Sequence, residues 1–108
     1  MTKNNGVEEI SEHEFESVIN KPLALVDFFA EWCMPCLMMA PAIEELAVKI
    51  KQVKFAKLNV DENQGLSQKF KVMSIPCLIF FKQGKEVERI IGNQPAEVIE
   101  EKLKKWMK

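Results

Sequence analysis

The period of hydrophobic and polar residues changes several times along this chain, and each change marks an expected element. A short apolar stretch at 7–10 is followed by Ser11 and then Glu14, a capping box that predicts the start of a helix. Residues 23–30, LALVDFFA, are almost continuously apolar over the length of one strand. Such a run is typical of a strand that is covered on both faces of a sheet.

The next segment, about 33–51, has its apolar residues at helical spacing. Ile43, Leu46, Ala47 and Ile50 stand at i, i+3, i+4 and i+7, so they form one stripe along a helix. The segment therefore predicts a long helix that packs this stripe against a core.

Two prolines and three methionines refine the prediction for this helix. Pro35 falls in the first turn, where its missing N–H costs nothing, whereas Pro41 lies inside the helix and should kink it. We expect Met38 and Met39 to fill the core. Met34 is expected to be exposed, where a flexible thioether can adapt to different contacts.

The second half of the chain completes an alternation of strands and helices. It predicts a strand at 53–60, a short helix at 63–70, a β-hairpin of strands 77–82 and 86–91 around Gly84, and a last helix opened by Pro95. Helical segments between buried strands favour parallel crossovers, and the hairpin adds antiparallel strands. We therefore expect an α/β fold, with a mixed central β-sheet flanked by helices on both faces.

Composition and charge narrow the classes of function. The chain has 108 residues, 47% of them hydrophobic and 29% charged, which is typical of one globular domain spanning 1–108. A net charge of -1 argues against nucleic acid or an anionic membrane as the main partner. The first residues are polar, and no apolar run is long enough to span a bilayer, so we expect a cytoplasmic location.

The cysteines Cys33 and Cys36 form a C-x-x-C pair, which could hold a metal, a fold or a redox centre. Structural zinc needs about four ligands, and beyond this pair the chain offers only Cys77 and His13. A disulfide across so short a loop stabilises little, and the expected compartment is reducing. Both structural interpretations are therefore weak.

The redox interpretation has a physical mechanism. The strand at 23–30 ends at the edge of the sheet where α/β folds place their sites, and Cys33 then falls at a helix N-terminus. The helix dipole and the free N–H groups there favour a thiolate. Cys36 lies nearly one turn further on the same face, so it can attack a mixed disulfide that Cys33 forms.

Two further residues stand out in apolar surroundings. Asp27 is a lone carboxylate in an apolar strand, where burial should raise its pKa and suit it to act as a general base. The alternative is that Asp27 faces water. Cys77 follows Pro76 and should lie within reach of the same region. We expect it to be buried, reduced and dispensable, because it heads an apolar strand.

The stretch VDFFAEWCMPC closely resembles the active-site stretch of the thioredoxin family. The resemblance extends over nearly the whole chain, through APAIEELA, VKFAKLNVDEN, IPCLIFFKQGK and the glycine at position 92. It implies the thioredoxin fold, with Cys33 as the exposed nucleophile and Cys36 as the resolving thiol.

The resemblance also implies supporting roles. Asp27 would be the buried carboxylate that helps to deprotonate Cys36, with Lys57 as its partner in the adjacent strand. Lys57 could instead extend its ammonium group to the surface. Pro76 would be a cis-proline, although an ordinary trans bond is the alternative.

The implied target-binding surface surrounds the cysteines. The backbone of Ile75 would pair with the target chain. The residues of this surface would be Trp32, Met34, Pro35, Val60, Ile75, Pro76, Ile91 and Gly92.

The function implied by this resemblance is reduction of protein disulfides by dithiol–disulfide exchange. Such a protein needs no bound cofactor or metal, acts as a monomer, and takes its electrons from a thioredoxin reductase. Its partners would be proteins that contain disulfides. The alternatives are a glutaredoxin-like or disulfide-forming oxidoreductase, and a binding module that uses the same fold as a scaffold.

Overall fold

The computed structural model describes residues 6–108, which form strands and helices in the order expected from the sequence pattern. The elements are β1 (Val7–Ile10), α1 (Glu12–Ile19), β2 (Ala24–Phe29), α2 (Met34–Lys49), β3 (Lys54–Asn59), α3 (Gln64–Lys69), β4 (Cys77–Lys82), β5 (Lys85–Ile91) and α4 (Ala96–Trp106). Residues 1–5 of the expected domain lie outside the described residues.

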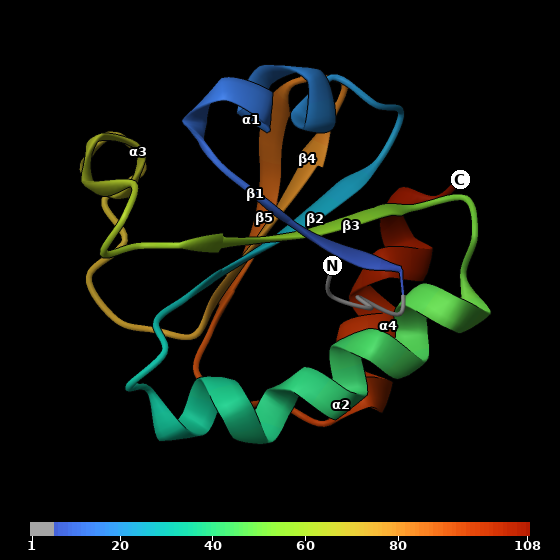
Figure 1. The fold of residues 1–108 in the computed structure, drawn as a ribbon. Helices are drawn as coiled ribbons and strands as arrows, with labels where there is room; N and C mark the ends of the chain where they lie inside the picture. Colours follow the sequence, from blue (N-terminus) through green and yellow to red (C-terminus); the bar gives the residue numbers. More distant parts are fainter. Residues whose placement is uncertain (1–5) are drawn as a thin grey trace.

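The five strands form one mixed sheet in the order β1-β3-β2-β4-β5. β1, β3 and β2 run parallel, whereas β4 is antiparallel to both β2 and β5. Figure 1 shows helices α1 and α3 on one side of this sheet and α2 and α4 on the other. The predicted fold class, a mixed sheet with helices on both faces, is therefore confirmed.

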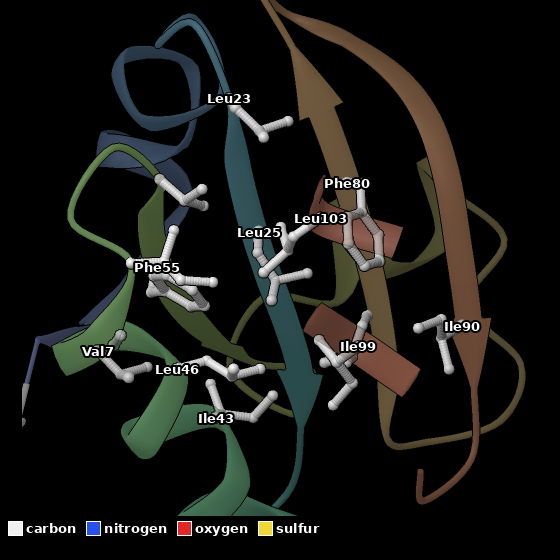
Figure 2. Close-up of a cluster of buried hydrophobic side chains, with 14 of the residues drawn as sticks. Val7, Leu23, Leu25, Ile43, Leu46, Phe55, Phe80, Ile90, Ile99 and Leu103 are labelled. Atoms are coloured by element: carbon white, nitrogen blue, oxygen red, sulfur yellow. The ribbon is translucent and has the colours of Figure 1, made fainter. Parts of the chain in front are cut away.

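Each face of the sheet has its own hydrophobic core. On the first face, Ile43 of α2 and Ile99 of α4 pack with Leu25 of β2 (Figure 2). On the opposite face, Phe15 of α1 packs with Val26 of β2. Successive residues of one strand thus enter opposite cores, as the two-residue repeat of a strand requires.

Local signals in the sequence set several element boundaries. The side-chain oxygen of Ser11 accepts a hydrogen bond from the N–H of His13, and the Glu14 carboxylate accepts one from the N–H of Ser11, which completes the predicted capping box. The β4–β5 hairpin turns through Gln83 and Gly84, both at positive φ (50° and 91°), the conformation that a two-residue hairpin loop needs.

One prediction about the long helix is wrong. Met39 is buried as expected, but Met38 is exposed rather than part of the core. Each helical step rotates a side chain by about 100°, and the side of α2 that faces the sheet is occupied by Cys36, Met39 and Ile43. Met38 therefore points outward, on the same side as the exposed Pro41, which lies between the two ends of the helix.

Residues 6–108 contain neither a membrane-spanning helix nor a cluster of metal ligands. Within that range, no helix is both long and apolar enough to cross a membrane. The same range contains no group of three or more His, Cys, Asp or Glu side chains placed to hold a metal ion.

Candidate active site

The two cysteines of the C-x-x-C pair lie where β2 ends and α2 begins. Cys33 is the N-cap residue of α2, in extended backbone conformation, and Pro35 stands in the first turn. A disulfide joins Cys33 to Cys36, with the Cα atoms 5.3 Å apart. The backbone N–H of Cys36 also donates a hydrogen bond to the Cys33 sulfur at 3.1 Å. One free N–H of the helix N-terminus is therefore directed at the sulfur atom of Cys33.

The disulfide is covered by a small cluster of apolar side chains. Cys33 and Cys36 pack with Ala30, and Val60 and Ile75 lie against them. Cys33 is only 3% exposed, so the expectation of an exposed nucleophile is wrong for this oxidised form. The reason is that Val60 and Ile75 come from loops distant in the sequence. They meet the cysteines only after the strands have paired into the sheet.

Asp27 is a buried carboxylate in the middle of β2, as the apolar run predicted. Burial raises its pKa from 3.8 to about 7, whereas the positive charge of Lys57 acts in the opposite direction. Its Oδ1 atom has no hydrogen-bond partner among the described residues. Asp27 and Phe29 alternate onto the same face of β2, and Phe29 packs against the cysteine cluster. The acid therefore faces the cysteine side of the sheet.

Lys57 is the register neighbour of Asp27 in β3, as the resemblance implied. Its ammonium group, however, lies over the ring of Phe29, 5.3 Å from the ring centroid. Within residues 6–108, no ion pair joins Lys57 to Asp27, although the lysine still lowers the pKa of the acid through space. The cation thus leaves the Asp27 carboxyl free to hold or release a proton.

The loop before β4 forms the other side of the site. The Ile75–Pro76 peptide bond is cis, as expected. The carbonyl of Pro76 accepts a hydrogen bond of 2.8 Å from the N–H of Gly92, which follows β5. Gly92 has φ +95°, a conformation that glycine adopts without strain. The loop thus places Ile75 against the cysteine cluster, and the Pro76–Gly92 bond ties it to the end of β5, where Ile91 is exposed.

Trp32 is held by residues that the sequence did not single out. The indole N–H donates a hydrogen bond of 2.8 Å to Asp61, and the ring remains 72% exposed. Asp61 belongs to the loop after β3, whose shape is fixed by the Asn59 side chain accepting from the N–H groups of Asp61 and Glu62. Asparagine and aspartate after a strand are a turn signal, but nothing local reveals the contact with Trp32.

Cys77 is buried and unpaired, as expected, but it does not face the cysteine pair. It packs in the core of the opposite face, with Phe28 as its cross-strand neighbour. Burial raises the pKa of the Cys77 thiol, although the charge of Arg89 opposes this shift. Strand alternation directs the Cys77 side chain to the far side of the sheet from the cysteine pair, while the charge of Asp27 still adds to the rise in its pKa.

A cysteine pair at a helix N-terminus, at the edge of the sheet beside a cis-proline loop, defines a dithiol–disulfide redox site. The family model described as Thioredoxin matches residues 6–105. The chain belongs to the thioredoxin family, and it is a thiol–disulfide oxidoreductase.

Similar proteins agree with this assignment. A thioredoxin from Chlamydia pneumoniae is 46% identical over 93 residues, covering 86% of this chain and 91% of its own length. A thioredoxin from Staphylococcus aureus is 43% identical over 103 residues, covering 94% and 99%. Among solved structures, a thioredoxin from Halobacterium salinarum covers 100% of this chain and 96% of its own, with 29% identity and a TM-score of 0.91. One from Plasmodium falciparum covers 92% and 98%, with 34% identity and a TM-score of 0.86.

Proposed function

We propose that the protein reduces disulfides of other proteins, with Cys33 as the nucleophile and Cys36 as the resolving thiol. The Cys33 thiolate attacks one sulfur of the target disulfide, forming a mixed disulfide and releasing the other target sulfur as a thiolate, which takes up a proton. Cys36 then loses its proton and attacks the Cys33 sulfur. The target leaves with two thiols, and the protein keeps the Cys33–Cys36 disulfide.

The observation that carries this proposal is the position of Cys33 at the N-cap of α2. Its sulfur accepts the N–H of Cys36 and is close to the positive end of the helix dipole, and both interactions stabilise a thiolate. Cys36 stands inside the first turn, where its sulfur has a short path to the first one. This asymmetry favours Cys33 as the attacking residue.

Asp27 is proposed as the group that accepts the Cys36 proton. A carboxyl with a pKa of about 7 is matched to proton transfer at neutral pH. Lys57 tunes that pKa without an ion pair that would fix the carboxylate in its charged form. Both roles would operate in the second step, when the mixed disulfide is resolved.

The proposed docking surface surrounds the disulfide. Trp32, Met34 and Ile91 expose large apolar side chains there, and Val60 and Ile75 are half-buried beside the cysteines. The backbone of Ile75 would pair with an extended target segment, next to Pro35, Pro76 and Gly92. Apolar contacts and main-chain hydrogen bonds suit a surface that accepts many sequences.

Electron supply and cellular context complete the proposal. Each cycle leaves a disulfide, so a reductant must restore the two thiols, and we assign this to a thioredoxin reductase. The protein would act as a cytoplasmic monomer in which residues 1–108 form a single domain. The exchange itself needs no bound cofactor, since both electrons come from the two thiols.

Trapping of the mixed disulfide tests these roles. Reduced Cys36→Ser protein should form a stable mixed disulfide with insulin through Cys33, whereas Cys33→Ser protein should form none. Cys77→Ser serves as the matched control and should behave like the wild type. Faster alkylation of Cys36 than of Cys33 by iodoacetamide at neutral pH would show that the roles are reversed.

A further inference from the structure

The outward side of the first turns of α2 carries a stripe of exposed apolar side chains. Met34, Leu37 and Met38 stand at i, i+3 and i+4, so they are neighbours on one side of the helix. They are 64%, 56% and 68% exposed. We call these three residues the α2 stripe.

The α2 stripe lies in a stretch of the chain that has no charged residues. From Trp32 to Ile43 the sequence contains no Asp, Glu, Lys or Arg. The inner side of the same turns is also apolar, and it is buried against the sheet through Cys36 and Met39. A helix that is hydrophobic all round is normally covered on all sides, and an exposed contiguous apolar patch marks an interaction site.

The α2 stripe is continuous with the place where a target disulfide must react. Cys33 caps the helix, and Met34 follows it directly. Met38 lies five positions after Cys33, or about 7.5 Å along the helix axis. An extended chain advances about 3.3 Å per residue, so two or three residues of a target would span that distance.

We propose that Leu37 and Met38 form a subsite for a bulky apolar side chain, two or three residues from the cysteine of the target's disulfide. This inference rests on the proposed role of Cys33 as the nucleophile. An acidic or basic target residue would find no opposite charge on the α2 stripe, so its burial there would be unfavourable. Methionine suits this position because its flexible thioether can follow side chains of different shapes.

The size of the α2 stripe favours a target segment over a second copy of this chain. A stable dimer buries about 800 Å² on each partner, whereas three side chains that are already partly covered offer much less. A brief encounter that needs only a few contacts beside the reacting sulfur fits the stripe. The segment around the target cysteine is the one part of a partner that must come this close to Cys33.

The test compares peptide disulfides that differ at one residue. Each substrate is a symmetric disulfide of a short peptide with Leu or Ser three residues after its cysteine, and a second pair carries the change three residues before it. The protein variants are Leu37→Gln, Met38→Gln and the double variant. Glutamine removes the apolar surface without adding a charge near the thiols.

Val48→Gln is the matched control. Val48 lies on the same helix and is 57% exposed, against 56% for Leu37. It stands ten positions beyond Met38, about 15 Å further along the axis. Hydroxyethyl disulfide serves as a second control, because this small substrate reaches the sulfur without covering the α2 stripe.

The wild type and Val48→Gln should prefer the Leu peptide of at least one pair by about fivefold to twentyfold in kcat/KM, the gain from burying one such side chain. In the double variant this preference should fall to about twofold or less, while the rate with hydroxyethyl disulfide stays unchanged.

Four results would overturn the proposal. The first is a wild type without the preference, or a double variant that keeps it. The second is an equal loss of rate with hydroxyethyl disulfide, which would place the effect on the exchange itself. The third is a dimer, seen by light scattering at assay concentrations, that the double variant abolishes. A wild type inactive on hydroxyethyl disulfide would refute the proposed exchange chemistry, and the inference with it.

Discussion

Asp27 on one face of the sheet and Cys77 on the other provide a comparison within one molecule. The two residues lie on adjacent strands, β2 and β4, and both are buried. Burial raises the pKa of each side chain, to about 7 for Asp27. Asp27 faces the side covered by α2, where the cysteine pair lies, whereas Cys77 faces the core beneath α1 and α3.

Burial perturbs a titratable group but does not by itself give it a function. Asp27 retains a carboxylate oxygen without a hydrogen-bond partner in the described part of the chain, on the side of the sheet where the cysteine pair lies. Cys77 packs in the hydrophobic core of the opposite face and behaves as a small apolar residue. Asp27 pairs with Leu78, the residue next to Cys77 in β4. Successive side chains of a strand point to opposite faces, so this one-residue difference places the two groups in different cores.

The largest expected effect is the difference in insulin-reducing activity between variants that lack Cys33 and variants that lack Cys77. Cys33→Ser should reduce insulin disulfides at least about 10³-fold more slowly than the wild type, because the attacking thiolate is gone. Cys77→Ala should stay within about twofold, since its side chain packs in the core of the opposite face. Turnover of insulin with a chemical reductant measures both variants. A tenfold loss in Cys77→Ala would end the distinction between the faces.

Thiol counting on the oxidised native protein supplies an independent check of the same contrast. One slowly reacting thiol, mapped to Cys77, is the expected result. A bridge from Cys77 to either active-site cysteine would contradict its position on the opposite face.

Asp27→Ala should change both the rate of resolution and the pH dependence of stability. Resolution of the mixed disulfide should slow by about 10²-fold when the base is removed. Folded Asp27 holds its proton up to a pKa of about 7, whereas the unfolded carboxyl loses it near 3.8, so the folded state binds more protons between these values. The contribution of Asp27 to the wild-type unfolding free energy therefore falls as pH rises from about 4 to 7, by about 4 kcal/mol.

Urea unfolding of the oxidised protein across this pH range measures the second effect. The difference in unfolding free energy between Asp27→Ala and the wild type should shift in favour of the variant as pH rises. Cys77→Ala is the control and should follow the wild-type pH profile below neutral pH. A difference independent of pH would show that Asp27 keeps the same protonation state folded and unfolded.

The contacts that hold α4 and α1 against the sheet should respond differently to acid. On the Asp27 face, α4 is tied to β5 through Glu88, which accepts a hydrogen bond from the Trp106 indole and pairs with Lys102 and Lys105. On the Cys77 face, α1 is held by the packing of Phe15 against Phe70 and Phe81. Only the first set of contacts contains a titrating carboxylate.

The bond from Trp106 and the two lysines lower the pKa of Glu88 from 4.5 to about 2. Its contribution is present above pH 4.5 and is lost as pH falls toward 2. Glu88→Gln should cost about 1–2 kcal/mol at pH 7, because the pair is partly screened by water, and hydrogen exchange should increase in α4 more than in α1. Glu101→Gln, at an exposed position of the same helix, is the matched control. Equal exchange in both helices would contradict the prediction.

The smallest effect is expected at the rim of the site. Asp61→Ala removes the acceptor of the Trp32 indole N–H, so the ring should sample more orientations. The KM for insulin should rise about twofold to fivefold with little change in kcat, and Trp32 fluorescence should lose anisotropy. Asp61→Asn keeps an acceptor oxygen and should recover most of the difference. An unchanged anisotropy in Asp61→Ala would show that the bond does not hold the ring.

Much of this molecule follows from local sequence signals. Ser11 and Glu14 cap a helix within one turn, and the apolar run around Asp27 identifies a strand covered on both faces. Cys33 and Cys36 stand between that strand and the next helix, so their position at a helix N-terminus needs no long-range information. Spacing, capping and strand length act over a few residues, and they were sufficient to predict the element order and the redox pair.

Other features were decided only by the closed fold. The face on which Cys77 lies, the direction of the Lys57 ammonium toward Phe29, and the bond from Trp32 to Asp61 join segments that are distant in the sequence. The outward direction of Met38 depends on which side of α2 meets the sheet. The local sequence determines whether a side chain is apolar or charged. Only the pairing of strands and the packing of helices determine which groups that side chain faces.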